Sequence, residues 1–168
     1  MRKGFLAIVM FLAIVGCSEK EIPTTEGITV PNISHMSMTK SEAFSTPNGD
    51  FSVLGKIGEY ALLKDLSKPF KVEKNDTYTW VIWSSNKAQL LGKQVKVYGT
   101  HDKFPKGKEI GFGMIRELDQ DDPQYPLREQ CLKFDVEIKP IISGKWKVDT
   151  FVADKLLGTT VIFVDEKE

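Results

Sequence analysis

The chain of 168 residues is long enough for one domain and too short for two once a targeting segment is subtracted. Its hydrophobic fraction of 41% and charged fraction of 27% are those of a globular protein, which argues against disorder along the whole chain. Basic and acidic residues both number 23, so the excess of positive charge on which nucleic-acid binding depends is missing, and we expect no nucleic-acid partner.

Residues 1–16 have the organisation of a secretory signal peptide. Arg2 and Lys3 precede an uninterrupted apolar run from Phe5 to Val15. A run of this length is too short to cross a hydrocarbon core, which needs about 20 residues, but it is typical of the apolar part of a signal peptide. An ordinary signal peptide with an incidental cysteine after it is one interpretation.

The end of this segment favours a different interpretation. Its residues Ile14-Val15-Gly16-Cys17 resemble the lipobox of bacterial lipoproteins. The resemblance implies cleavage between Gly16 and Cys17 and transfer of a diacylglycerol to the Cys17 thiol. Because more than one buried acyl chain anchors a protein stably, we expect a lipid-anchored protein on the extracytoplasmic face of a bacterial cell membrane. Apart from this covalent lipid, no cofactor is expected.

Residues 17–46 are predicted to form a flexible tether behind the lipidated cysteine. The stretch is polar, contains Pro23 and Pro31, and lacks sustained helical or strand periodicity. The cluster Pro47-Asn48-Gly49-Asp50 is typical of a turn and is predicted to open the folded domain, residues 47–168. With Cys17 acylated, Cys131 is the only remaining thiol, so the domain must fold without an internal disulfide.

Alternation of apolar and polar residues dominates the domain. In residues 132–138, four apolar side chains alternate with charged ones, which indicates a strand with one buried face. Further strands are predicted at 51–55, 60–63, 77–83, 95–98, 145–152 and 156–164, with an irregular strand at 110–114 and a short helical turn at 87–91. The last three strands are predicted to form a meander.

About seven or eight short strands with almost no helix predict an all-β fold, an immunoglobulin-like antiparallel β-sandwich. Two segments also resemble uncharacterised lipoproteins of Bacillus and its relatives: residues 78–83, and Ser143-Gly144-Lys145-Trp146-Lys147-Val148-Asp149 followed by Lys155-Leu156-Leu157-Gly158. The second segment is similar to the last two strands of many bacterial immunoglobulin-like modules. The resemblance covers residues 48–165 and implies a fold and a location; it implies no catalytic residues.

The predicted faces of the strands suggest where a partner binds. If Tyr78, Trp80 and Ile82 face the core, Trp83 faces outward, and Phe151 lies on the polar register of its strand. Outward aromatic side chains are typical of binding surfaces. The stretch 101–130, rich in proline and charge, is predicted to be a long loop suited to binding. We therefore expect a non-enzymatic binding or accessory module whose partner is an envelope protein or a wall polymer.

The alternative is an extracytoplasmic protein that binds a metal or a small ligand. His35, Met36 and Met38 offer imidazole and thioether ligands that suit Cu(I), and His101 and Met114 could add to them. Two weaker patterns suggest other kinds of site. The carboxylates at positions 119, 121 and 122 could bind calcium, although the glycine of a calcium loop is missing, and Cys131 with a histidine could form a thiol nucleophile.

Overall fold

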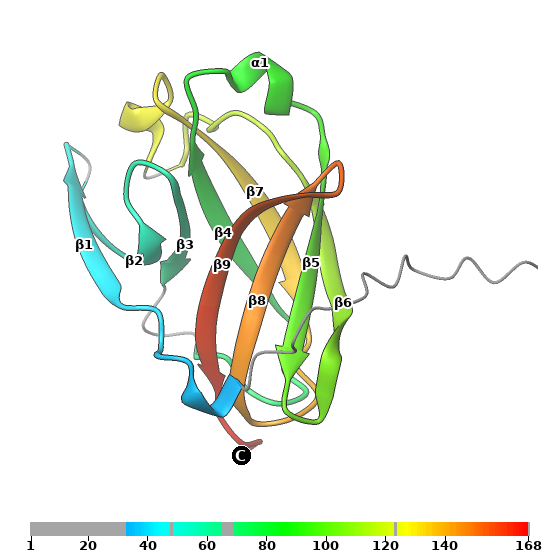
Figure 1. The fold of residues 1–168 in the computed structure, drawn as a ribbon. Coiled ribbons are helices and arrows are strands. Elements are labelled where there is room, and N and C mark those ends of the chain that lie inside the picture. Colours follow the sequence, from blue (N-terminus) through cyan, green and yellow to red (C-terminus); the bar gives the residue numbers. More distant parts are fainter. Residues whose placement is uncertain (1–32, 48, 65–68, 123, 168) are drawn as a thin grey trace, which may run out of the picture.

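The computed structural model describes residues 33–47, 49–64, 69–122 and 124–167, and in them nine strands form two antiparallel sheets. The five-stranded sheet has the order β1-β2-β3-β4-β7, and the four-stranded sheet has the order β6-β5-β8-β9. The two sheets pack face to face, with the four-stranded sheet in front in Figure 1. The predicted all-β sandwich is confirmed.

The strands are β1 (Ser41–Thr46), β2 (Gly49–Lys56), β3 (Tyr60–Lys64), β4 (Asp76–Trp83), β5 (Gln94–His101), β6 (Phe104–Met114), β7 (Cys131–Ile138), β8 (Gly144–Val152) and β9 (Lys155–Val164). The remaining elements are the 3₁₀ turns η1 (Ile33–His35) and η2 (Tyr125–Leu127) and the short helix α1 (Lys87–Leu90). Among the described residues, no helix has the length and apolar character needed to cross a membrane.

The core lies between the sheets and follows the alternation in the sequence. Trp80 of β4 pairs with Phe134 of β7 across the five-stranded sheet, and their rings stack with centroids 5.3 Å apart. From the other sheet, Val97 of β5 and Val148 of β8 face the same core. Because every second residue of these strands is apolar and buried, the opposite faces of both sheets are left for solvent or for a covering segment.

The predicted meander of the last three strands is wrong. β7 pairs with β4 in the five-stranded sheet, whereas β8 and β9 form a hairpin in the four-stranded sheet. Residues 139–143 carry the chain from one sheet to the other. Alternation shows that a strand has one buried face, but β7 and β8 show the same pattern whether they lie in one sheet or in two facing sheets.

The folded part begins upstream of the predicted boundary at residue 46. β1 pairs along its whole length with β2, from Ser41 opposite Leu54 to Thr46 opposite Gly49. The predicted turn at 47–50 therefore joins two strands. Just before β1, the Thr39 amide donates to the Val161 carbonyl oxygen over 3.0 Å, and the Val161 amide donates to Thr39 Oγ1 over 2.6 Å.

This correction has a physical reason. An edge strand is held by main-chain hydrogen bonds and needs no apolar alternation, so the sequence of β1 gave no periodic pattern to read. Further upstream, Ile33 of η1 is only 1% exposed. Residues 33–46 therefore belong to the sandwich, and the rest of the predicted tether, residues 17–32, lies outside the described residues, as does the predicted signal peptide with Gly16.

The predicted loop 101–130 is only partly a loop. Residues 104–114 form β6, which returns along β5 with register shifts near Val97 and Gly99. Residues 116–122 and 124–130, including η2, then cross the outer face of β4 and β7. There Val81, Leu118 and Cys131 form a second, small core, each at most 5% exposed.

β6 lies very close to β7, and two glycines allow the approach. A Cβ atom on Gly111 would lie 2.4 Å from Cγ1 of Val136. Just beyond the strand, Arg116 and Lys133 exchange main-chain hydrogen bonds of 2.8 and 2.9 Å. Because glycines occupy the positions that face β7, the alternating positions Phe112 and Met114 face outward.

Candidate functional site

A row of large side chains crosses the outer face of the four-stranded sheet. Phe112 of β6 lies opposite Lys96 of β5, Lys96 lies opposite Phe151 of β8, and Phe151 lies opposite Leu156 of β9. Phe112 is 64% exposed and Leu156 is 56% exposed. We call these four residues, together with the neighbouring Met114, the outer row.

Side chains on the same face of the sheet support the aromatic part of the outer row. The ring of Tyr98 meets the ring of Phe151 edge-on, with centroids 5.6 Å apart. The Tyr98 hydroxyl donates to Oε2 of Glu109 over 3.3 Å. Partial burial, with the nearby carboxylate of Glu109, raises the pKa of Tyr98 above its ordinary value. Phe151 is thus half-buried on a fixed support, while Phe112 and Leu156 stand out from the sheet.

Some charged side chains on this face form ion pairs and others do not. Further down β8, Lys147 forms an ion pair with Asp149 over 2.6 Å, and Thr159 donates to the other oxygen of Asp149. In the part of the chain that the structure describes, no ion pair involves Lys96, which lies between the two phenylalanines of the outer row. The row therefore presents apolar side chains around one available positive charge.

Trp83 and Phe151, the two residues predicted to share a partner surface, lie on different sheets. Trp83 ends β4 in the five-stranded sheet, where it packs against the small core formed with residues 115–130. It is half-buried, and Val81, two residues earlier on the same face of β4, is completely covered. A single flat partner cannot contact both residues, and the outer row of Phe151 is the more exposed of the two surfaces.

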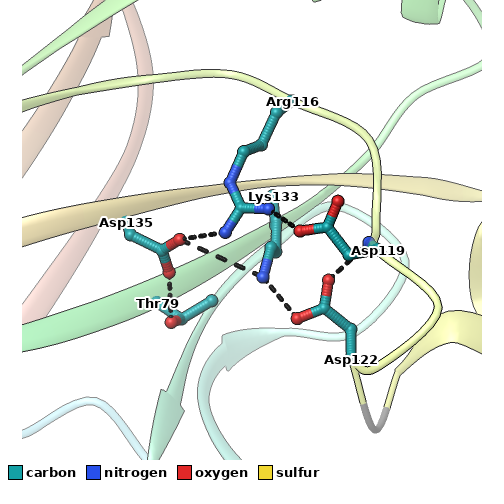
Figure 2. A network of polar contacts seen from close by, with 6 residues as sticks. All are labelled: Thr79, Arg116, Asp119, Asp122, Lys133 and Asp135. Carbon is teal, nitrogen blue, oxygen red and sulfur yellow. Dashed lines mark hydrogen bonds and ion pairs between the residues drawn. The ribbon is translucent and has the colours of Figure 1, made fainter.

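A network of charged side chains fastens residues 115–122 to the five-stranded sheet (Figure 2). Arg116 donates to Asp135 of β7 over 2.7 Å and also pairs with Asp119. Lys133, whose side chain is only 7% exposed, pairs with Asp122 and lies 4.0 Å from Asp135. The carboxylates considered for calcium at positions 119 and 122 are therefore paired with cations, which leaves them poorly suited to bind one.

The thiol of Cys131 is held in an unreactive state. It is fully buried and points at the main-chain oxygen of Leu127, 3.3 Å away. Burial raises the pKa of Cys131 to about 11, so the thiolate is scarce at neutral pH. The ring of His101 packs against Trp146 and accepts a hydrogen bond from the Lys103 amide at Nδ1. Both residues thus serve packing roles.

The residues considered for copper do not all lie on one surface. His35 is the last residue of η1 and Met36 follows it. The turn η1 lies over the outer face of β8, and Met38 is 41% exposed. His101 points to the interior side of the same sheet, and Met114 is part of the outer row. Among the residues described by the structure, no three histidine, cysteine or acidic side chains lie close enough together to hold a metal ion.

A cleft of about 660 Å³ opens beside the β6 edge of the sandwich. Its inner wall is apolar and includes Ile110, Trp146 and Val148. Lys108 and Lys139 lie among its charged lining residues, and no ion pair with a carboxylate involves either of them within the described ranges. An apolar wall with a charged border is typical of sites for small amphipathic ligands.

Comparison with known proteins adds little to this geometry. No family model matches the chain, and no curated protein matches it. One solved structure to which it is similar is described as a "Putative Lipoprotein from Bacillus anthracis": the identity is 10%, the match covers 84% of this chain and 99% of that chain, and the TM-score is 0.49. The fold and the candidate site therefore rest on the described residues of this chain.

Proposed function

We propose that this chain is a lipid-anchored protein of the bacterial cell envelope that acts as a non-enzymatic binding module, and that the outer row is its binding surface. The observation that carries the proposal is the exposure of Phe112, Met114 and Leu156 on one rigid sheet face. Several large exposed apolar side chains on one face of a sheet are typical of binding surfaces. The lipobox-like segment ending in Cys17 supports the anchor.

The state of the polar groups favours binding over catalysis. The candidate nucleophile Cys131 is buried and protonated, and the candidate base His101 is packed on Trp146. A binding module also needs its surface to be preorganised, because ordering flexible side chains weakens association. Tyr98 and the strands of the four-stranded sheet supply that rigidity to Phe151.

In-cell photo-cross-linking tests the proposal. A photoreactive phenylalanine analogue replaces Phe112 in the anchored protein, and a matched variant carries it at the exposed Gln120, in the segment that covers the outer face of the other sheet. We expect adducts, whether with protein, polymer or lipid, from position 112 and few from position 120. Equal adduct patterns from the two positions would remove the outer row as the binding surface.

The anchor is tested separately. Cys17→Ala is expected to move the protein from the membrane fraction to the soluble fraction and to remove the acyl mass from the N-terminal peptide. Retention of that acyl mass, or unchanged membrane association, would contradict lipidation at this residue.

A second candidate function is the binding of a small amphipathic ligand in the cleft beside β6. The apolar wall at Trp146 and Val148 favours a linear apolar chain. The cleft is also lined by carboxylates, but Asp135 is paired with Arg116, and Glu109 and Glu137 accept hydrogen bonds from Tyr98 and Asn75. Lys108 and Lys139 are therefore the groups left to receive an anionic head group. Titration with lauric acid measures this directly by calorimetry. We expect binding that weakens in Lys108→Gln; the absence of heat with the unmodified protein would eliminate this candidate.

A further inference from the structure

We infer that the partner of the outer row is the anionic surface of the membrane itself, so that the outer face of the four-stranded sheet lies against the bilayer. The inference rests on the proposed function, because it takes the lipid anchor at Cys17 as its starting point. The inference goes beyond the proposed function by naming what the outer row contacts and by fixing the orientation of the domain. Three observations lead to it.

The first observation is where the anchored end of the chain meets the sandwich. Lys145 of β8 donates from Nζ to the main-chain oxygens of Ser34 and Met36 over 3.0 and 2.8 Å, which holds η1 on the outer face of the four-stranded sheet. Figure 1 shows η1 at the lower end of β8 and β9, on the front of the molecule. The chain that leads to the anchor therefore arrives on the same face that carries the outer row.

The second observation is the length of chain between the anchor and the fold. Ile33 follows Cys17 by 16 residues, which can span at most about 55 Å. Along β8, Lys145 and Phe151 are six residues apart, or about 20 Å at the rise of a strand. If the face that carries η1 turns toward the bilayer, the outer row reaches the lipid without the chain passing around the domain.

The third observation is the chemistry of the outer row. Phe112 and Met114 stand out from β6 on one side of Lys96, and Phe151 and Leu156 lie on its other side, on β8 and β9. A bilayer interface accepts such separate apolar side chains without the shape complementarity that a protein partner requires, and a lysine among them extends its ammonium to the lipid phosphates.

Charge around the outer row points the same way. Lys96 lies on the outer face between Phe112 and Phe151, and in the described ranges no carboxylate forms an ion pair with it. Two carboxylates of the same face are occupied, since Asp149 is paired with Lys147 and Glu109 accepts a hydrogen bond from Tyr98. Lys96 thus offers its positive charge to anionic head groups. Because the anchor keeps the domain at a high effective concentration near the bilayer, weak contacts of this kind are enough to orient it.

Site-directed spin labelling of the whole lipidated protein tests this orientation. The protein is reconstituted in vesicles of phosphatidylglycerol and phosphatidylethanolamine with a nitroxide at Gln94→Cys, a position beside Met114 that leaves the outer row intact. The matched control carries the label at Gln120→Cys, an exposed position in the segment that covers the opposite face. Cys131 is 0% exposed, so it does not compete for the label in the folded protein.

We expect the label at position 94 to be accessible to oxygen dissolved in the lipid and protected from a water-soluble nickel complex, and the label at position 120 to show the reverse. In the labelled Gln94→Cys protein, Lys96→Gln is expected to shift the label toward water on anionic vesicles and to have no effect on zwitterionic ones. A label at position 94 as exposed to water as the control overturns the inference.

Two further outcomes separate the possible failures. Broadening of the spectrum by a second nearby label at position 94 would show that another copy of the chain covers the face, and would also overturn the inference. Flotation of the protein with the vesicles and the acyl mass at Cys17 report on the anchor alone. A protein that floats but keeps position 94 in water retains its proposed anchor and loses only this orientation.

Discussion

A Cβ atom on Gly113 would lie 2.4 Å from the main-chain oxygen of Asp135, so β6 can lie along β7 only because position 113 has no side chain. The same approach turns Phe112 and Met114, the neighbours of Gly113, away from β7 and toward solvent. The outward direction of Phe112 and Met114 and the close contact of β6 with β7 are therefore two consequences of the glycines in β6.

Gly113→Ala is expected to destabilise the fold, because the added methyl group must push β6 away from the backbone of β7. Overpacking at a site without free space costs about 1–3 kcal/mol of the free energy of unfolding. Urea denaturation measures the loss, and Met114→Ala, one residue along on the exposed face, is the control and should change stability by about 0.5 kcal/mol or less. Equal effects of the two substitutions would mean that β6 can shift freely.

Asp135 is expected to make stability dependent on acid pH. Its partial burial alone would raise the pKa, but hydrogen bonds from Thr79 and Arg116 and the charge of Lys133 outweigh burial and hold the pKa below its ordinary value. A carboxylate with a lowered pKa in the folded state contributes stability that is present above about pH 4 and is lost as pH falls through its folded value.

Urea denaturation between pH 2.5 and pH 7 measures this contribution. Asp135→Asn should lower stability at pH 7 by about 1–3 kcal/mol, since it removes hydrogen bonds to charged partners, and should flatten the decline below pH 4. Glu137→Gln, at the next outward position of β7, is the matched control. An unchanged acid profile in Asp135→Asn would show that the network in Figure 2 does not contribute in this way.

Lys133 and Asp122 are expected to be strongly coupled. Lys133→Met leaves the largely buried carboxylate of Asp122 without its cation, which should cost about 3 kcal/mol. The double variant with Asp122→Asn removes both charges. Its loss of stability should therefore be smaller than the sum of the losses in the two single variants. A double-mutant cycle measured in urea gives the coupling energy. Simple additivity would show that the two side chains do not interact in solution.

Cys131 is expected to be chemically inert in the folded protein. With its pKa raised to about 11 and its side chain buried, little thiolate is present or accessible at pH 8. Alkylation by iodoacetamide, followed by mass spectrometry, should be slow without denaturant and rapid in urea. A thiol introduced at the exposed position 77 should react quickly under both conditions, and equal native rates for the two thiols would contradict the buried placement.

The strands could be predicted because burial on one face imposes an apolar period of two, and β4, β7 and β8 show it clearly. Their distribution between the two sheets could not be predicted. Val136 of β7 and Val148 of β8 alternate with polar residues in the same way, although the two strands belong to different sheets. β1 could not be predicted either. It is held at an edge by main-chain hydrogen bonds, which any residue except proline can make.

Only part of the outer row could be predicted from the sequence. Phe151 lies on the polar register of its strand, so its outward direction follows from alternation alone. The outward direction of Phe112 depends on the approach of Val136 and Asp135 to the glycines of β6, which is a contact between distant parts of the chain. Glycines at alternate positions of a strand are the sequence feature that could have indicated it. Trp83 was placed on the correct face, but residues 115–130 cover that face.

Lys145 is expected to hold η1 on the sandwich without contributing much to global stability. Its ammonium satisfies the main-chain oxygens of Ser34 and Met36, so Lys145→Met should loosen residues 33–39 while leaving the core intact. Hydrogen exchange followed by mass spectrometry should show faster exchange in this segment, with global stability lowered by about 1 kcal/mol or less. Lys147→Met, one outward position along β8, is the control and should leave exchange at 33–39 unchanged. Faster exchange throughout β8 and β9 would mean that Lys145 supports the whole sheet, and the anchored end of the chain would then not be positioned by this contact.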